Sequence, residues 1–108
     1  MNIGQIAKMA QQMQAQMAQA QEELKSTTLE ASAGGGAVRI VITGAQEVRS
    51  VEIDPSAVDP EEVEMLQDLV MTAINEAIGR SKELERERMA GIAGGMGLPG
   101  VPGLPGFG

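Results

Sequence analysis

The hydrophobic period of this chain changes twice along its length, and these changes constrain the fold more than any other feature. From residue 2 to about residue 25, apolar residues recur in alternating steps of three and four, which is the period of an α-helix. Between about residues 26 and 53 they alternate every second residue, which is typical of strands with one buried face. From residue 60 to about residue 88 the helical period returns. The sequence therefore predicts an α+β fold with the element order α-β-β-β-α.

The first predicted helix has a narrow apolar seam with the spacing of a heptad repeat. The seam consists of Ile3, Ile6, Ala10, Met13, Met17, Ala20 and Leu24. Two apolar positions in seven suit one helical partner better than a broad globular core. The ridge formed by Met9, Met13 and Met17 has two interpretations, ordinary packing or an adaptable groove for a peptide.

Three short antiparallel strands are predicted in the middle of the chain, over residues 27–33, 38–43 and 47–53. Val51 and Ile53 fall on the buried phase of the third strand, whereas Val48 breaks that phase and indicates a bulge or a later start. Glycines at 34–36 separate the first two strands. Because phosphate-binding glycine loops lead into a helix and these lead into a strand, we expect a hairpin here.

The second predicted helix starts at a group of capping residues and has a wide apolar face. Asp59 is the expected N-cap, Pro60 the first helical residue, and Glu62 the capping-box partner. Residues 47–68 carry eight acids and one base, which accounts for the whole net charge of −7. Acids near a helix N-terminus interact favourably with the helix dipole, so this acidic region needs no ligand to explain it.

The last part of the chain differs in composition from the rest. We predict a single dimerising domain over residues 1–89 and a disordered Gly/Pro-rich tail over residues 90–108. Apolar residues recur at every third position of the tail, at Leu98, Val101, Leu104 and Phe107. This spacing leaves open a second interpretation, in which the tail is a docking peptide.

Composition makes catalysis an unfavourable interpretation. The chain has no histidine and no cysteine, so the most common general base, the most common metal ligand and any thiol nucleophile are missing. Glu64 and Asp68 are one helical turn apart without a third ligand, which indicates a solvated face. We therefore expect no enzyme activity, no metal, no cofactor and no small-molecule substrate. No secretory signal or membrane span is recognisable, which favours a cytoplasmic protein.

The aliphatic core also suggests a partner. A single Phe and no Trp or Tyr leave only aliphatic residues and methionine to build the core. Such a core is marginal at this chain length, so burial against a second copy would complete it.

Basic residues gather at the end of the second helix. They are Arg80, Lys82, Arg86 and Arg88, and Lys8 lies near the start of the first helix. Glutamates are interleaved with the cluster at positions 76, 83, 85 and 87, at spacings that allow ion pairs along one helix. Two interpretations remain, an ion-paired solvent face and a surface that contacts phosphates.

The order of elements and three segments resemble the YbaB/EbfC family of bacterial nucleoid-associated proteins. The segments are "AGGGAVRIVITG", "VRSVEIDPSAV" and "LQDLVMTAINEAIGRSKEL". The resemblance implies a tweezers-like homodimer with projecting helical arms. It also implies low-specificity binding to double-stranded DNA in the nucleoid, for chromosome organisation or gene regulation. Antiparallel arm helices would bring Lys8 close to Arg80, Lys82, Arg86 and Arg88, which we predict as the DNA-binding residues.

The same resemblance includes Asn75, for which we expect a structural or solvent-facing role rather than contact with bases. The alternative function is a protein–protein interaction module that acts with replication or recombination proteins and has little intrinsic DNA affinity. Four bases against three acids between residues 80 and 88 predict weak DNA binding at physiological salt.

Overall fold

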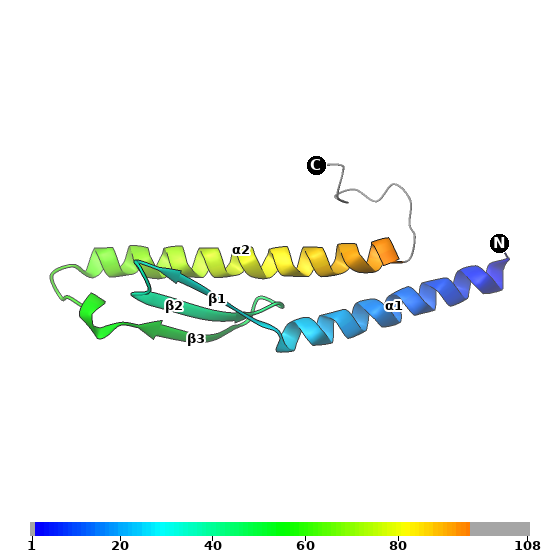
Figure 1. Ribbon diagram of the computed structural model, residues 1–108, viewed down its shortest axis with the longest axis horizontal. Helices are drawn as coiled ribbons and strands as arrows, with labels where there is room; N and C mark the ends of the chain where they lie inside the picture. Colours follow the sequence, from blue (N-terminus) through cyan, green and yellow to red (C-terminus); the bar gives the residue numbers. More distant parts are fainter. Residues whose placement is uncertain (1, 96–108) are drawn as a thin grey trace.

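The computed structural model describes residues 2–95 and confirms the predicted α-β-β-β-α order. Its elements are α1 (Ile3–Ser26), β1 (Thr28–Ala33), β2 (Val38–Thr43), β3 (Val48–Ile53), the short 3₁₀ helix η1 (Pro55–Ala57) and α2 (Val63–Gly95). Figure 1 shows an elongated molecule in which α2 covers the sheet at one end and lies alongside α1 at the other. Most of the predicted tail lies outside the described residues.

The three strands form an antiparallel sheet in the order β1-β2-β3. All three glycines of the first hairpin have positive φ, at 65° for Gly34, 68° for Gly35 and 96° for Gly36. Only glycine adopts such a run without strain, which confirms the hairpin interpretation. The register between β2 and β3 shifts between Val41 and Ile42, so the irregularity predicted near Val48 is present.

The core lies between α2 and the strands β1 and β2. Its buried residues are Ala31, Val38, Ile40, Ile42, Ala73 and Ala77. Small alanines on α2 allow the helix to approach the larger aliphatic side chains of β2 closely. Val51 and Ile53 pair with core residues of β2, yet they stay 49% and 40% exposed. The expectation that these two residues are buried is therefore wrong for the single chain, because α2 packs on β1 and β2 and leaves β3 uncovered.

Both ends of α2 differ from the prediction. Asp59 caps a separate turn, since its side chain accepts a hydrogen bond from the Glu61 backbone N–H (3.0 Å) and its carbonyl accepts one from that of Glu62 (2.9 Å). The helix itself begins at Val63, later than expected, and continues to Gly95 instead of ending near Arg88. It thus crosses the predicted boundary between residues 89 and 90, and the division into domain and tail stays a prediction.

Candidate nucleic-acid interface

The end of the molecule opposite η1 is built from two antiparallel helices, which we call the helical arm (residues 3–26 of α1 and 80–95 of α2). Ala20 and Leu24 of α1 are buried, at 3% and 2% exposure. An ion pair between Glu23 and Arg88 joins the two helices. The apolar seam of α1 therefore packs against α2 near the body, as its narrow width predicts.

A buried polar cluster fixes the base of the arm to the sheet. The Ser81 hydroxyl donates to the Thr43 carbonyl (2.6 Å) and accepts from the backbone N–H and side-chain Nε2 of Gln46 (3.1 and 2.9 Å). Ser81 is fully buried, and Gln46 has the left-handed φ of 60°. The β2–β3 turn is thereby held against α2 at the point where that helix leaves the body.

The same turn also contacts the end of α1. A Cβ on Gly44 would lie 2.7 Å from the Leu24 side chain and 3.1 Å from its carbonyl oxygen. Only glycine fits at this distance, so the turn sits directly against α1. The Gly44 N–H also donates to the Thr27 carbonyl (2.9 Å), which ties both helices of the arm to one turn.

Three of the predicted DNA-binding residues form ion pairs with glutamates. Arg80 pairs with Glu76 (2.8 Å) and also donates to the Glu30 carbonyl of β1 (2.9 Å). Arg86 pairs with Glu83 (2.5 Å), and Arg88 pairs with Glu23 as described. These arginine side chains stay 46–72% exposed, so the ion-paired solvent face expected from the sequence is present.

The two predicted lysines have different surroundings. Lys82 is exposed and has no carboxylate partner among residues 2–95. Lys8 is also exposed, but the expectation that it lies close to the basic cluster is wrong. The Glu23–Arg88 pair shows which residues of the two helices lie level, and Lys8 lies 15 residues before Glu23, about 22 Å further along α1. Figure 1 shows this part of α1 extending past the end of α2.

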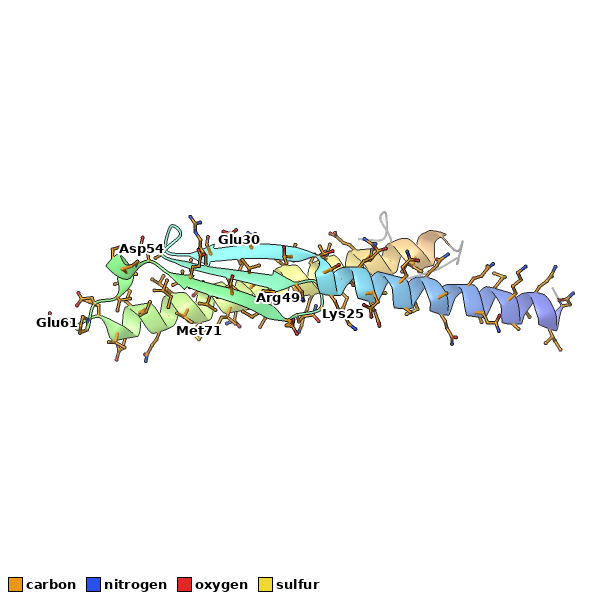
Figure 2. The ribbon with its side chains drawn as sticks, turned by 90° about the horizontal axis from the view of Figure 1, so that it is seen from below. Lys25, Glu30, Arg49, Asp54, Glu61 and Met71 are labelled. Carbon is orange, nitrogen blue, oxygen red and sulfur yellow. The ribbon has the colours of Figure 1, made fainter. Side chains whose placement is uncertain are left out.

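Most of the acidic region lies toward the end of the molecule away from the arm, but Glu47 lies at the base of the arm, paired with Arg49, which donates to the Lys25 carbonyl (3.1 Å). Figure 2 shows Asp54 and Glu61 at the end away from the arm. Two hydrogen bonds hold the pKa of Asp54 below its ordinary value, first from the Ser56 backbone N–H and then from the Ser56 hydroxyl (both 2.9 Å). Asp54 and Glu61 therefore add negative charge at the end of the molecule away from the arm.

Within residues 2–95 no three acidic residues come together in a way that could hold a metal ion. No helix in the same range is long and apolar enough to cross a membrane.

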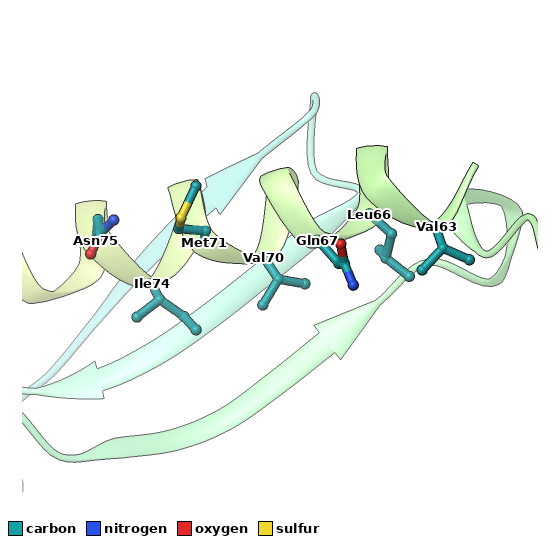
Figure 3. A pocket seen from close by; sticks show the side chains of 7 residues that line it. All are labelled: Val63, Leu66, Gln67, Val70, Met71, Ile74 and Asn75. Atoms are coloured by element: carbon teal, nitrogen blue, oxygen red, sulfur yellow. The ribbon is translucent and has the colours of Figure 1, made fainter.

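An apolar groove runs along α2 beside the uncovered strand β3, and the sequence interpretation did not identify it. Its volume is about 460 Å³, and it is lined by Val63, Leu66, Gln67, Val70, Met71, Ile74 and Asn75. Figure 3 shows Leu66, Val70 and Ile74 pointing from α2 toward the strands. Asn75, which we expected to be structural or solvent-facing, is exposed at one end of the groove. The wide apolar face of α2, together with apolar residues on β3, was the signal that could have revealed it.

Fold and surface together define a small α+β protein with a projecting basic arm and an uncovered apolar face. The chain belongs to the YbaB/EbfC DNA-binding family, whose model matches residues 1–96.

Curated relatives with the name "Nucleoid-associated protein" match most of the chain. The relative from Acetivibrio thermocellus is 50% identical over 96 residues, covering 89% of this chain and 85% of its own. That from Moorella thermoacetica is 52% identical over 101 residues, covering 91% and 97%. Among solved structures, an uncharacterized protein from Helicobacter pylori matches with a TM-score of 0.72 at 28% identity, over 83% of this chain and 94% of its own. This likeness agrees with the α+β fold described above.

Proposed function

We propose that this protein is a homodimeric, nucleoid-associated protein of the cytoplasm that binds double-stranded DNA with low sequence specificity. Its role would be chromosome organisation or gene regulation, without catalysis. The observation that carries the proposal is the exposed basic cluster on the arm of a chain from a DNA-binding family. We infer contact with phosphates rather than bases, because the arm has no aromatic residue to stack on bases and no groove-reading motif.

Ion pairing on the arm lowers the affinity without blocking it. Exposed pairs of this kind contribute only about 0–1 kcal/mol each, so a phosphate can replace the glutamate partner of Arg86 or Arg88 at small cost. Lys82 has no described partner to lose and would make its contact directly. Few phosphates are then neutralised per chain, and we expect weak binding with a marked salt dependence.

Salt-dependent titration of a duplex tests the DNA contact. Lys82→Glu/Arg86→Glu is expected to reduce affinity at least tenfold at low salt and to flatten the salt dependence, since each lost phosphate contact lowers the slope by about one. Arg39→Glu/Arg49→Glu is the matched control, because it makes the same charge change on β2 and β3, outside the arm. Equal losses in both variants would attribute the effect to net charge. Absence of binding by the unaltered protein at low salt would favour the interaction-module alternative.

Dimerisation would cover the apolar groove and the inner face of β3. Val48, Val51 and Ile53 stay 40–49% exposed on that strand, opposite the exposed groove residues of α2. An uncovered apolar strip of this kind is typical of protein–protein contact sites. A second copy would supply the core that the aliphatic composition leaves incomplete.

Two methionines of α2 provide a matched test of the dimer. Met71 lines the groove and is 56% exposed, whereas Met65 is 58% exposed and does not line it. We expect Met71→Lys to shift the mass from light scattering toward the 11.3 kDa monomer, and Met65→Lys to leave it unchanged. A monomeric unaltered protein at micromolar concentration would contradict the dimer.

A further inference from the structure

We propose that residues 96–108 dock on the outer part of the α1 seam of the same chain. The described residues cover this seam at one end only. Leu24 and Ala20 are buried and Met13 is half-buried, whereas Ile6 is 53% and Ile3 84% exposed. Apolar spacing is the same along the whole seam, so its first turns carry a packing surface that no described residue covers.

The end of α2 lies where this cover is lost. The Glu23–Arg88 ion pair shows the register of the two antiparallel helices. Because the helices are antiparallel, Gly95, seven residues after Arg88, lies about level with Gln16, seven residues before Glu23. Figure 1 shows α1 continuing past this level. The chain that leaves α2 therefore starts next to the exposed part of the seam.

The composition and length of the following segment fit this surface. It has 13 residues, none of them charged, and apolar residues at positions 98, 101, 104 and 107. Fully extended, it would span up to about 43 Å. The seam from the level of Gln16 to Ile3 is only about 20 Å long.

The apolar groove of α2 is a less suitable site for the same segment. Its nearest lining residue, Asn75, is 20 residues before Gly95, about 30 Å along the helix. Its other end at Val63 is about 48 Å away, beyond the reach of the segment. The seam is thus the apolar surface that the whole segment can reach.

Spacing along the two surfaces also agrees. In an extended polyproline-type segment, residues three apart share a face and lie about 9 Å apart. On an α-helix, residues seven apart share a face and lie about 10.5 Å apart. The step from Leu98 to Val101 therefore matches the step from Met13 to Ile6. Lys8 lies on the side of α1 opposite the seam, so docking would leave it exposed.

A nitroxide label on the segment tests where it binds. The chain has no cysteine, so Gly106→Cys gives one labelling site and keeps every apolar residue of the segment. We expect amide NMR signals of residues 3–13 to broaden in the labelled chain, and Ile6→Gln to remove that broadening. Broadening confined to residues 63–75, or absent altogether, would overturn the proposal. In a mixture of isotope-labelled, spin-free chains with spin-labelled, unlabelled chains, broadening can arise only between copies. Broadening of residues 3–13 in that mixture as strong as the labelled fraction allows would assign the contact to a second copy and overturn the proposal.

Hydrogen exchange gives an independent readout. In Leu98→Ser/Val101→Ser, amides of residues 7–13 should exchange roughly tenfold faster, since partial burial of one aliphatic side chain is worth about this factor. Val58→Ser/Met65→Ser is the matched control, because both side chains are exposed at the other end of the molecule. Unchanged exchange in the first variant would contradict docking. Neither experiment involves DNA. Docking of residues 96–108 can therefore be refuted while DNA binding stands, and DNA binding can be refuted while docking stands.

Discussion

Replacement of Ser81 by alanine tests how the arm is held to the body. The change removes three hydrogen bonds of a fully buried hydroxyl, to the Thr43 carbonyl and from two nitrogens of Gln46. At about 0.5–1.5 kcal/mol each, these would sum to about 1.5–4.5 kcal/mol. Every partner keeps a second bond, however. The Gln46 N–H still donates to Thr43 and its Nε2 to the Gly44 carbonyl, so the low end of this range applies.

Helix propensity offsets part of this loss, since alanine is better than serine in a helix by about 0.5 kcal/mol. We therefore expect Ser81→Ala to lower the free energy of unfolding by about 1–1.5 kcal/mol. Urea unfolding followed by circular dichroism measures it, at one chain concentration because a dimer's stability depends on concentration. Ser50→Ala on exposed β3 is the control, with an expected change below about 0.5 kcal/mol. Equal losses in the two variants would refute the assignment of the buried cluster as a structural junction.

Two further predictions concern backbone contacts and acid titration. Gly44→Ala should destabilise the fold by about 1–3 kcal/mol, because its Cβ would meet the Leu24 side chain and carbonyl. Gly79→Ala, with nothing within 4 Å, should stabilise α2 by about 0.5–1 kcal/mol, and opposite shifts in the thermal midpoint check both. Ser56→Ala should raise the pKa of Asp54 only part of the way to its ordinary value, because the backbone N–H, the larger cause, remains. Because the folded-state pKa of Asp54 is lowered, its contribution to folding stability is present above the ordinary aspartate pKa and is lost as pH falls through the folded-state pKa. An unchanged NMR titration of the Asp54 carboxyl in Ser56→Ala would contradict the role of the Ser56 hydroxyl.

The sequence pattern predicted a helix or strand correctly where that element buries a single face. The alternating residues of β1 and β2 identify their buried faces, because each strand packs on α2 from one side only. The ends of α2 could not be predicted in the same way. Asp59 does cap a turn, but that turn precedes the helix. At the other end, the glycines at 91, 94 and 95 are poor helix formers, so local propensity predicts an end before Gly95.

Periodicity also leaves two properties of the candidate site undetermined. It gives the face on which a residue lies, but not the offset between two helices, so the position of Lys8 relative to Arg88 was predicted wrongly. Contacts distant in sequence set that offset, namely those of the β2–β3 turn with Ser81 of α2 and Leu24 of α1. Similarly, the apolar phase of Val51 and Ile53 was read correctly from the sequence. Whether α2 buries these two side chains depends on where the helix crosses the sheet, and no local sequence pattern encodes that position.

The arrangement of charge along the molecule reconciles a net charge of −7 with the proposed DNA contact. Residues 47–68 account for all of that charge, and they lie just before and on β3, on η1 and at the start of α2. Most of them lie away from the arm, and Glu47 lies at its base. Exposed charges more than about 8–10 Å apart are largely screened at physiological salt, so this region would repel a duplex at the arm only weakly. Affinity would then depend on the local competition between phosphates and the glutamates paired with Arg86 and Arg88. Since that exchange is nearly neutral in free energy, the gain comes mainly from counterions released by the duplex, and Lys82 gains most because no described carboxylate has to be displaced.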